Sequence, residues 1–477
     1  MIDSNWERVG LVEAPNAESG KNIGIVILDN IVSHPSISHL ENRVKRVRVA
    51  HDFSITCSNV TEEPFKTNLK EHKKHGLMIL NLLSHKPFDL NEKYYVGLAS
   101  ASTFIFLPTS SEPEKTKLGL EWILDQDWNI RVLLNLRVPE AEGWMSPNAD
   151  HPHFQALAPA LTKDILIVSA GGNSKAHNNL HPIEYFTISG FNDHGLHQVE
   201  NYEQHSSVPF GMNSEGYYRP DLLAPYTYLP LPSLLGQKKL DYFGGTCGSA
   251  TLIAGLSAYY FSTTAGLSPN DIRSAFMQAG VIDNKFEAPI VNGSKTLKLL
   301  RKGFKASDGR LLTDTLIKVT DPFVDIDSKS AIKRALALTV LIQRARLSRD
   351  EIWEYVDDDS HEVKKVAITG LEAPENGIER ELFWSYTFKE SSQFGVREVW
   401  AYALLKTSVK AEISNWIKLI KVNPSIDLLI CFSFFLKEHY QSFPEMEITP
   451  DPASIHPLVT SIIDWYNDYV LNEAKDL

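Results

Sequence analysis

The chain has 477 residues, of which 43% are hydrophobic and 22% charged, and its net charge is -12. This is an ordinary globular composition, and the length allows about three domains. The acidic balance and scattered Lys and Arg argue against nucleic acid as a partner, and no apolar run reaches the roughly 18 residues of a membrane span, so we expect no membrane partner either.

From about residue 22 to residue 277, short apolar runs alternate with longer mixed segments. Runs that are apolar nearly throughout predict parallel strands covered on both faces, and apolar spacings of three and four predict helices. The predicted strands are 23–28, 94–99, 102–107, 130–136 and 165–170, and the predicted helices are 71–83, 115–127, 153–161 and 248–262. This alternation predicts an α/β fold with a doubly wound, mostly parallel sheet, whose reactive groups gather where strands end and helices begin.

After about residue 292, helical patterns dominate. Four helical segments align on one another, starting at Ser330, His361, Phe394 and Pro424. Their matching apolar residues, separated by 31, 33 and 30 positions, are Ile332, Val363, Val396 and Ile426. This period resembles HEAT-like helical repeats, in which stacked helix pairs share a core. An irregular helical bundle with coincidental spacing is the alternative.

The apolar pattern thins between Val281 and Thr313, which predicts a domain boundary there. We therefore expect an α/β domain over residues 1–290, a linker over 291–312 and an all-α domain with HEAT-like repeats over 313–477.

Four residues stand at predicted junctions between an apolar strand and a helix or loop. Asp29 ends the first run, His75 opens HGLMILNLL, Asn173 lies in SAGGNS, and Cys247 precedes the apolar run of GTCGSATLIAG. Taken singly, the first three are ordinary: such residues usually cap a helix, support a fold or sit in a loop. At the start of a helix, backbone N–H groups stabilise negative charge, which suits a cysteine nucleophile.

Together these residues occur in the order Asp, His, Asn, nucleophile, which is the order found in subtilisin. Over about residues 20–285 the chain resembles the subtilisin-like proteases. The segments that carry the resemblance are ILDNIVSHPSI, HGLMILNLL, GLASAST, SAGGNS, YRPDLLAP and GGTCGSATLIAGLSA. The resemblance implies a subtilisin-like fold and a peptidase that works through an acyl-enzyme.

The resemblance also implies a role for each residue. Asp29 would orient His75 and stabilise its cation, and His75 would take the proton of the nucleophile and return it to the leaving amine. Asn173 and the backbone N–H of Cys247 would donate to the developing oxyanion. No cofactor and no metal are expected.

Cys247 stands where the family has serine. Ser249 lies two positions further on, about 200° around a helix, so we favour Cys247 as the nucleophile. Cysteine is competent beside a histidine, but a site shaped for serine must accommodate the larger sulfur. Three explanations stay open: a native cysteine protease, a weakened enzyme of natural or engineered origin, and a pseudoenzyme.

The segment NLRVPE places Leu136 and Arg137 where the family has a substrate-binding strand. Arg137 in that position predicts a preference for an acidic or polar P1 residue, the residue whose carbonyl is attacked. An outward, solvated arginine is the alternative.

The three cysteines, Cys57, Cys247 and Cys431, are far apart, which predicts reduced thiols and no zinc site. The short segment before the first strand leaves no room for a folding prodomain, so the resemblance implies an intracellular member. We predict a cytoplasmic endopeptidase that cleaves a selected protein, with a helical arm that recruits the substrate or a regulatory protein. The alternative is an inactive scaffold that binds a protein partner.

Overall fold

The computed structural model describes residues 2–66, 71–109, 112–139, 149–174, 181–205, 208–213, 218–234, 239–283, 285–286, 288–306, 321–390, 395–422 and 425–439. The predicted helix starts at Phe394 and Pro424 lie outside these residues. So do 307–312 of the predicted linker, and 313–320 and 440–477 of the predicted all-α domain.

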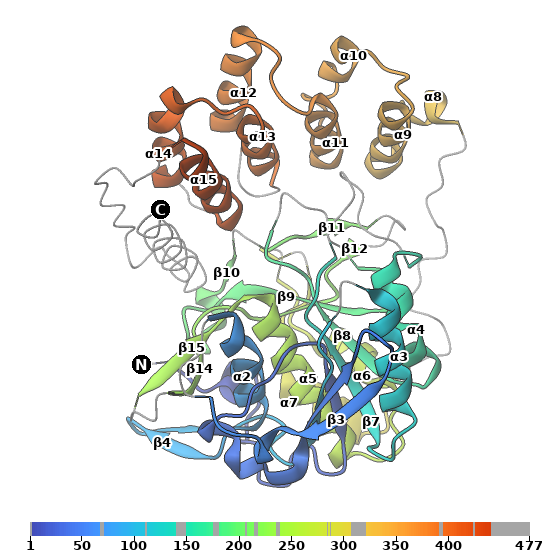
Figure 1. Cartoon of the computed structure of the whole chain (residues 1–477), viewed down its shortest axis with the longest axis vertical. Coiled ribbons are helices and arrows are strands. Elements are labelled where there is room, and N and C mark those ends of the chain that lie inside the picture. The colour runs from blue at the N-terminus through green and yellow to red at the C-terminus, as the bar shows by residue number, and fades with distance from the viewer. Residues whose placement is uncertain are drawn as a thin grey trace.

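The described residues up to position 306 contain a nine-stranded sheet with helices on both faces (Figure 1). The strand order is β10-β9-β8-β7-β1-β6-β2-β3, with β13 also pairing with β9; only β3 and β10 run antiparallel to their neighbours. The strands are β1 Gly24–Ile27, β2 Val44–Val49, β3 Ile55–Asn59, β6 Thr103–Phe106, β7 Ile130–Asn135, β8 Leu166–Ala170, β9 Phe186–Asn192, β10 Glu203–Gln204 and β13 Leu222–Pro225. The predicted α/β fold with a doubly wound, mostly parallel sheet is confirmed.

Successive residues of each strand point to opposite faces, and both faces are apolar. Ile25 and Ile27 of β1 join one core cluster, whereas Val26 and Leu28 join another on the opposite face. The helices of this part are α1 Asn5–Arg8, α2 Glu71–Ser84, α3 Pro113–Leu124, α4 Pro152–Thr162, α5 Gly245–Thr263, α6 Pro269–Ala279 and α7 Gly293–Arg301, with 3-10 helices at Pro35–Arg43, Val60–Glu62 and Val199–Asn201.

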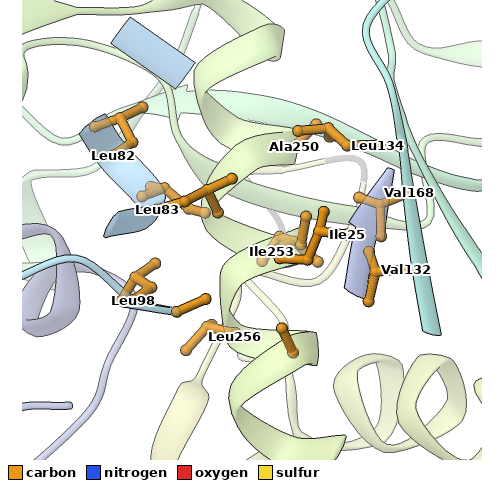
Figure 2. Packing of buried hydrophobic residues seen from close by; sticks show 14 of the residues in the cluster. Ile25, Leu82, Leu83, Leu98, Val132, Leu134, Val168, Ala250, Ile253 and Leu256 are labelled. Atoms are coloured by element: carbon orange, nitrogen blue, oxygen red, sulfur yellow. The ribbon is translucent and has the colours of Figure 1, made fainter. Parts of the chain in front are cut away.

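Helix α5 is the central element of the larger core. It packs against α2 on one side and against β7, β8 and β9 on the other. Figure 2 shows this packing: α5 supplies Ala250, Ile253 and Leu256, α2 supplies Leu82 and Leu83, and the strands supply Ile25, Val132, Leu134 and Val168. Because α5 is buried along almost its whole length, its first turn is held firmly against the sheet.

The prediction that residues 94–99 form a strand of the main sheet is wrong. Only its start, in β5 (Lys93–Tyr95), is extended, and it pairs with β4 (Phe88–Leu90) in a separate two-stranded sheet. The backbone of Gly97 and Ala99 instead donates to His85 and Leu83 at the end of α2. This apolar run is buried under a helix end and not between strands. Two further small sheets pair β11 (Gly211–Met212) with β12 (Tyr218–Arg219) and β14 (Leu229–Pro232) with β15 (Leu240–Phe243).

Described residues from 321 onward form helices joined by turns and loops. The helices are α8 Pro322–Asp325, α9 Ala331–Gln343, α10 Arg349–Trp353, α11 His361–Leu371, α12 Gly377–Lys389, α13 Val396–Leu405, α14 Ile413–Val422 and α15 Ile426–His439, with a 3-10 helix at Lys410–Glu412. The four segments aligned by sequence correspond to α9, α11, α13 and α15, and each packs against the next. They lie on the side that faces the sheet (Figure 1). The core of this helical region contains Trp400 and Trp416, both fully buried.

The starts of several of these helices follow local capping rules. Ser348 and Glu351 form a reciprocal capping box at α10, and the side chain of Asn376 accepts from the first N–H groups of α12. In the part of the chain that the structure describes, no helix is both long enough and apolar enough to cross a membrane.

Candidate active site

Asp29 and His75 meet at the carboxyl end of the central strand β1. The carboxylate Oδ2 of Asp29 pairs with Nδ1 of His75. The other oxygen, Oδ1, accepts from the backbone N–H of Asn30 at 2.6 Å. Both oxygens are therefore engaged, which fixes the carboxylate and, through it, the plane of the imidazole.

The surroundings of His75 favour its protonated form. Burial by itself lowers the pKa of His75, but hydrogen bonds to Asp29 and Cys247 and the attraction of both groups outweigh it and raise the pKa to about 10. The ring packs edge-on against Phe243, with 5.3 Å between the ring centroids. His75 thus has a fixed orientation between a carboxylate and a thiol.

Gly76 explains how α2 approaches β1 so closely. A Cβ atom at this position would lie 1.8 Å from the carbonyl oxygen of Asn30, closer than any contact that real Cβ atoms make. The loop that follows Asp29 therefore rests directly on the backbone of α2. A glycine after His75 is the local requirement that brings His75 to Asp29.

Cys247 is the third residue of α5 and is partly exposed. The chain enters the helix through Gly245, whose φ of 82° is the left-handed conformation that glycine adopts without strain. The thiol of Cys247 contacts the carbonyl oxygen of Leu136, 3.9 Å from Sγ, and its hydrogen bonding and charge help to raise the pKa of His75. The start of α5 thereby carries the thiol to the ends of β1 and β7.

Ser249 points elsewhere. Its hydroxyl is fully buried and donates to the carbonyl oxygen of Pro225 at 2.9 Å, with Ala224 also in reach. The rotation of two positions along α5 turns this side chain away from His75, as the helical geometry predicts.

Asn173 follows β8 and lies next to the start of α5. Its Oδ1 accepts hydrogen bonds from the backbone N–H and the hydroxyl of Thr246, at 3.0 and 3.2 Å, and from the hydroxyl of Tyr226 at 3.0 Å. Three donors around Oδ1 fix the orientation of the amide, so that its donating nitrogen, Nδ2, faces away from Thr246 and Tyr226. The structure thus brings Asp29, His75, Cys247 and Asn173 together around the start of α5.

The two residues predicted to bind substrate flank this group. Leu136 is partly buried against the main core, and its carbonyl oxygen contacts the thiol of Cys247. Arg137 is exposed, and its charge lowers the pKa of His153 in addition to the larger effect of burial. The end of β7 therefore borders the thiol, with a positive charge beside it.

Sequence reasoning missed Thr246 and Tyr226 as partners of Asn173. Thr246 was inside the motif around Cys247, so its position was a usable signal. Tyr226 follows YRPDLLAP, and the contact of its hydroxyl with Asn173 could not be read from the chain. Asp221, in the motif YRPDLLAP, has a structural role: it is buried and pairs with Arg219 at 2.5 Å and Arg273 at 3.1 Å.

Among the described residues, no group of three or more His, Cys, Asp or Glu side chains is arranged to hold a metal ion.

No protein-family model and no curated protein matches the chain. Among solved structures it is similar to the protease domain of PatA, with 17% identity and a TM-score of 0.47 over 61% of this chain and 100% of that one. It is also similar to the prenylagaramide maturation protease PagA (15% identity, TM-score 0.42, 59% of this chain and 95% of that one). A third similar structure is a protease of Pseudoalteromonas arctica (14%, 0.44, 62% and 97%).

Proposed function

We propose that this chain is a subtilisin-like endopeptidase with Cys247 as its nucleophile. The observation that carries the proposal is that His75 pairs with Asp29 and that Cys247, on the start of α5, also raises the pKa of His75 through hydrogen bonding and charge. A carboxylate that orients a histidine, which in turn contacts a nucleophile, is the arrangement used in acyl transfer. The oriented amide of Asn173 beside it adds a group suited to oxyanion stabilisation.

In the proposed reaction, His75 and Cys247 form an imidazolium–thiolate pair. The sulfur attacks the carbonyl carbon of the peptide bond, and the carbonyl oxygen becomes an oxyanion that accepts from Nδ2 of Asn173 and the backbone N–H of Cys247. The C–N bond then breaks as His75 gives its proton to the leaving amine. Water, deprotonated by His75, hydrolyses the thioester and releases the acid and the thiol.

The proposal assigns catalysis and substrate recruitment to two different parts of the chain. Buried apolar residues up to Leu300 and those from Ile326 onward belong to separate core clusters. This separation supports a catalytic domain and a distinct helical domain. The successive packing of α9, α11, α13 and α15 supports the HEAT-like interpretation, and such arrays bind proteins on extended surfaces. We propose a protein substrate, recruited by this array in the cytoplasm.

A peptide probe with a thiol-reactive group, followed by intact-mass measurement, tests the nucleophile. We expect one label on wild type, located at Cys247, none at that position in Cys247→Ala, and strongly slowed labelling in His75→Ala. The other cysteines serve as internal controls, since Cys431 is fully buried and Cys57 has no histidine partner among its described contacts. Ser249→Ala should label like wild type.

Cleavage of a peptide library then separates an enzyme from a scaffold. We expect turnover by wild type and by Ser249→Ala and none by Cys247→Ala. Labelling that does not depend on His75 would overturn the proposed pair. Labelling without any turnover would support the alternative, an inactive scaffold that binds a protein partner.

A further inference from the structure

Helix α15 contacts the turn that carries Asn173. The hydroxyl of Ser174, the residue after Asn173, donates to Oδ1 of Asp427 in the first turn of α15. The two residues are 253 positions apart, and Asp427 is fully buried. The last helix of the described array therefore reaches the candidate active site with a carboxylate. In Figure 1, α15 lies on the side of the array that faces the sheet.

The helical region holds this carboxylate in place. Tyr402 of α13 also donates to Oδ1 of Asp427, at 3.5 Å, and α13 packs against α15. Two residues before Asp427, the hydroxyl of Ser425 donates to Glu398 of α13 at 3.0 Å. Glu398 is in turn bound by Arg397, so the start of α15 is tied to the start of α13 by buried polar contacts. Asp427 is also well placed electrostatically, because a negative charge is favourable in the first turn of a helix.

Asp427 lies near a second group that orients Asn173. The hydroxyl of Tyr226 donates to Oδ1 of Asn173, and burial, reinforced by the negative charges of Cys247 and Asp427, raises the pKa of Tyr226. A phenol that keeps its proton keeps its ability to donate. Asp427 is thus hydrogen-bonded to the residue after Asn173, and its charge also acts on Tyr226, which donates to Asn173.

We propose that Asp427 is a positioning residue, which acts through Ser174 to keep Asn173 in place for the oxyanion, so that the helical region completes the active site. This inference rests on the proposed peptidase function. Its physical basis is that a displacement of about 1 Å of a catalytic group costs up to about 100-fold in rate. The contact matters for the transition state because Asn173 binds charge that develops only there.

Kinetics on the full chain test the proposal. Asp427→Ala and Ser174→Ala should each lower kcat about tenfold with KM unchanged, and the double variant should be no worse than either single one. Asp427→Asn keeps an oxygen acceptor for Ser174 and should restore most of kcat. In an Asn173→Ala background, Asp427→Ala should have no further effect on kcat. The matched control is Asp357→Ala, which removes a carboxylate that also accepts from a hydroxyl, that of Tyr386, within the helical region only.

Hydrogen-exchange mass spectrometry of the full chain provides a readout that does not need turnover. Peptides that cover residues 165–174 should exchange faster in Asp427→Ala and in Ser174→Ala than in wild type or Asp357→Ala. Unchanged exchange in this segment would overturn the inference even if no substrate is cleaved. A kcat that stays the same or rises in both variants while wild type is active would also overturn it, and absence of turnover in wild type would count against the peptidase function alone.

Discussion

The backbone N–H and the hydroxyl of Thr246 both donate hydrogen bonds to Oδ1 of Asn173, at 3.0 and 3.2 Å. Thr246 immediately precedes Cys247. It therefore links the proposed nucleophile, Cys247, to the proposed oxyanion donor, Asn173. The same hydroxyl also accepts from the backbone N–H of Gly172 at 3.1 Å. A single threonine thus joins the end of β8 to the start of α5.

We expect Thr246→Val, which keeps the shape but removes the hydroxyl, to lower kcat about tenfold with KM unchanged, which is less than the 10²–10³-fold expected for the loss of an oxyanion donor. The measurement is steady-state kinetics on a cleaved peptide. Thr296→Val is the matched control, because the hydroxyl of Thr296 is also buried and hydrogen-bonded, in its case to the carbonyl oxygen of Asn292, but lies in α7. Equal kcat values for the two variants would contradict the role of Thr246.

The raised pKa of His75 predicts a pH-dependent contribution to stability. Below the ordinary value of 6.5 the histidine is charged in both the folded and the unfolded chain, so the contribution is fully present. Between 6.5 and about 10 the unfolded chain loses its proton while the folded protein keeps it, and the contribution declines until it is lost above that range. The difference in urea midpoint between wild type and His75→Gln should therefore be larger near pH 6 than near pH 9. A difference that is constant over this range would show that His75 is not held as a cation.

Gly76→Ala should push α2 away from the loop after Asp29, because its Cβ would meet the carbonyl oxygen of Asn30 at 1.8 Å. We expect a loss of about 1–3 kcal/mol in the free energy of unfolding and slower labelling of Cys247. Gly377→Ala is the control: this glycine begins α12, and a Cβ there meets nothing within 4 Å. The control should be neutral or slightly stabilising, since alanine favours helix by up to about 1 kcal/mol. If both variants behave alike, the tight approach of α2 does not matter.

Asp221→Ala removes the shared partner of Arg219 and Arg273. Since all three side chains are buried, two guanidinium groups lose the carboxylate that they share, and we expect a cost of about 3–5 kcal/mol in the free energy of unfolding. Asp89→Ala, at an exposed position of β4, should change it by less than about 0.5 kcal/mol. Chemical denaturation of both variants measures the difference, and a small effect for Asp221 would mean that the arginines find other partners.

Arg137→Gly tests whether the end of β7 selects the substrate. If Arg137 attracts the P1 side chain, its removal should reduce the cleavage of peptides with an acidic P1 residue relative to those with a neutral one. Profiling of a peptide library before and after the change is the measurement. An unchanged profile would exclude Arg137 from the pocket and leave it as a solvated surface residue.

Much of the architecture was predictable because strands and helices leave local periodic patterns. The runs around Ile25 and Leu133 predicted buried parallel strands, and both lie in the central sheet. The run 94–99 failed because apolar content reports burial and not pairing: the backbone of Gly97 and Ala99 binds the end of α2. The four candidate site residues were also identifiable from their motifs, and the structure brings them to one place.

The sequence alone determined the α/β class, the helical character of the second half and the identity of the residues at the strand ends, because backbone geometry ties each of these to spacing along the chain. Only the tertiary structure decided which way the amide of Asn173 faces, through the hydroxyl of Tyr226, and that Ser174 meets Asp427. Those contacts join segments from distant parts of the chain. Their geometry depends on how whole elements pack, which no local pattern records.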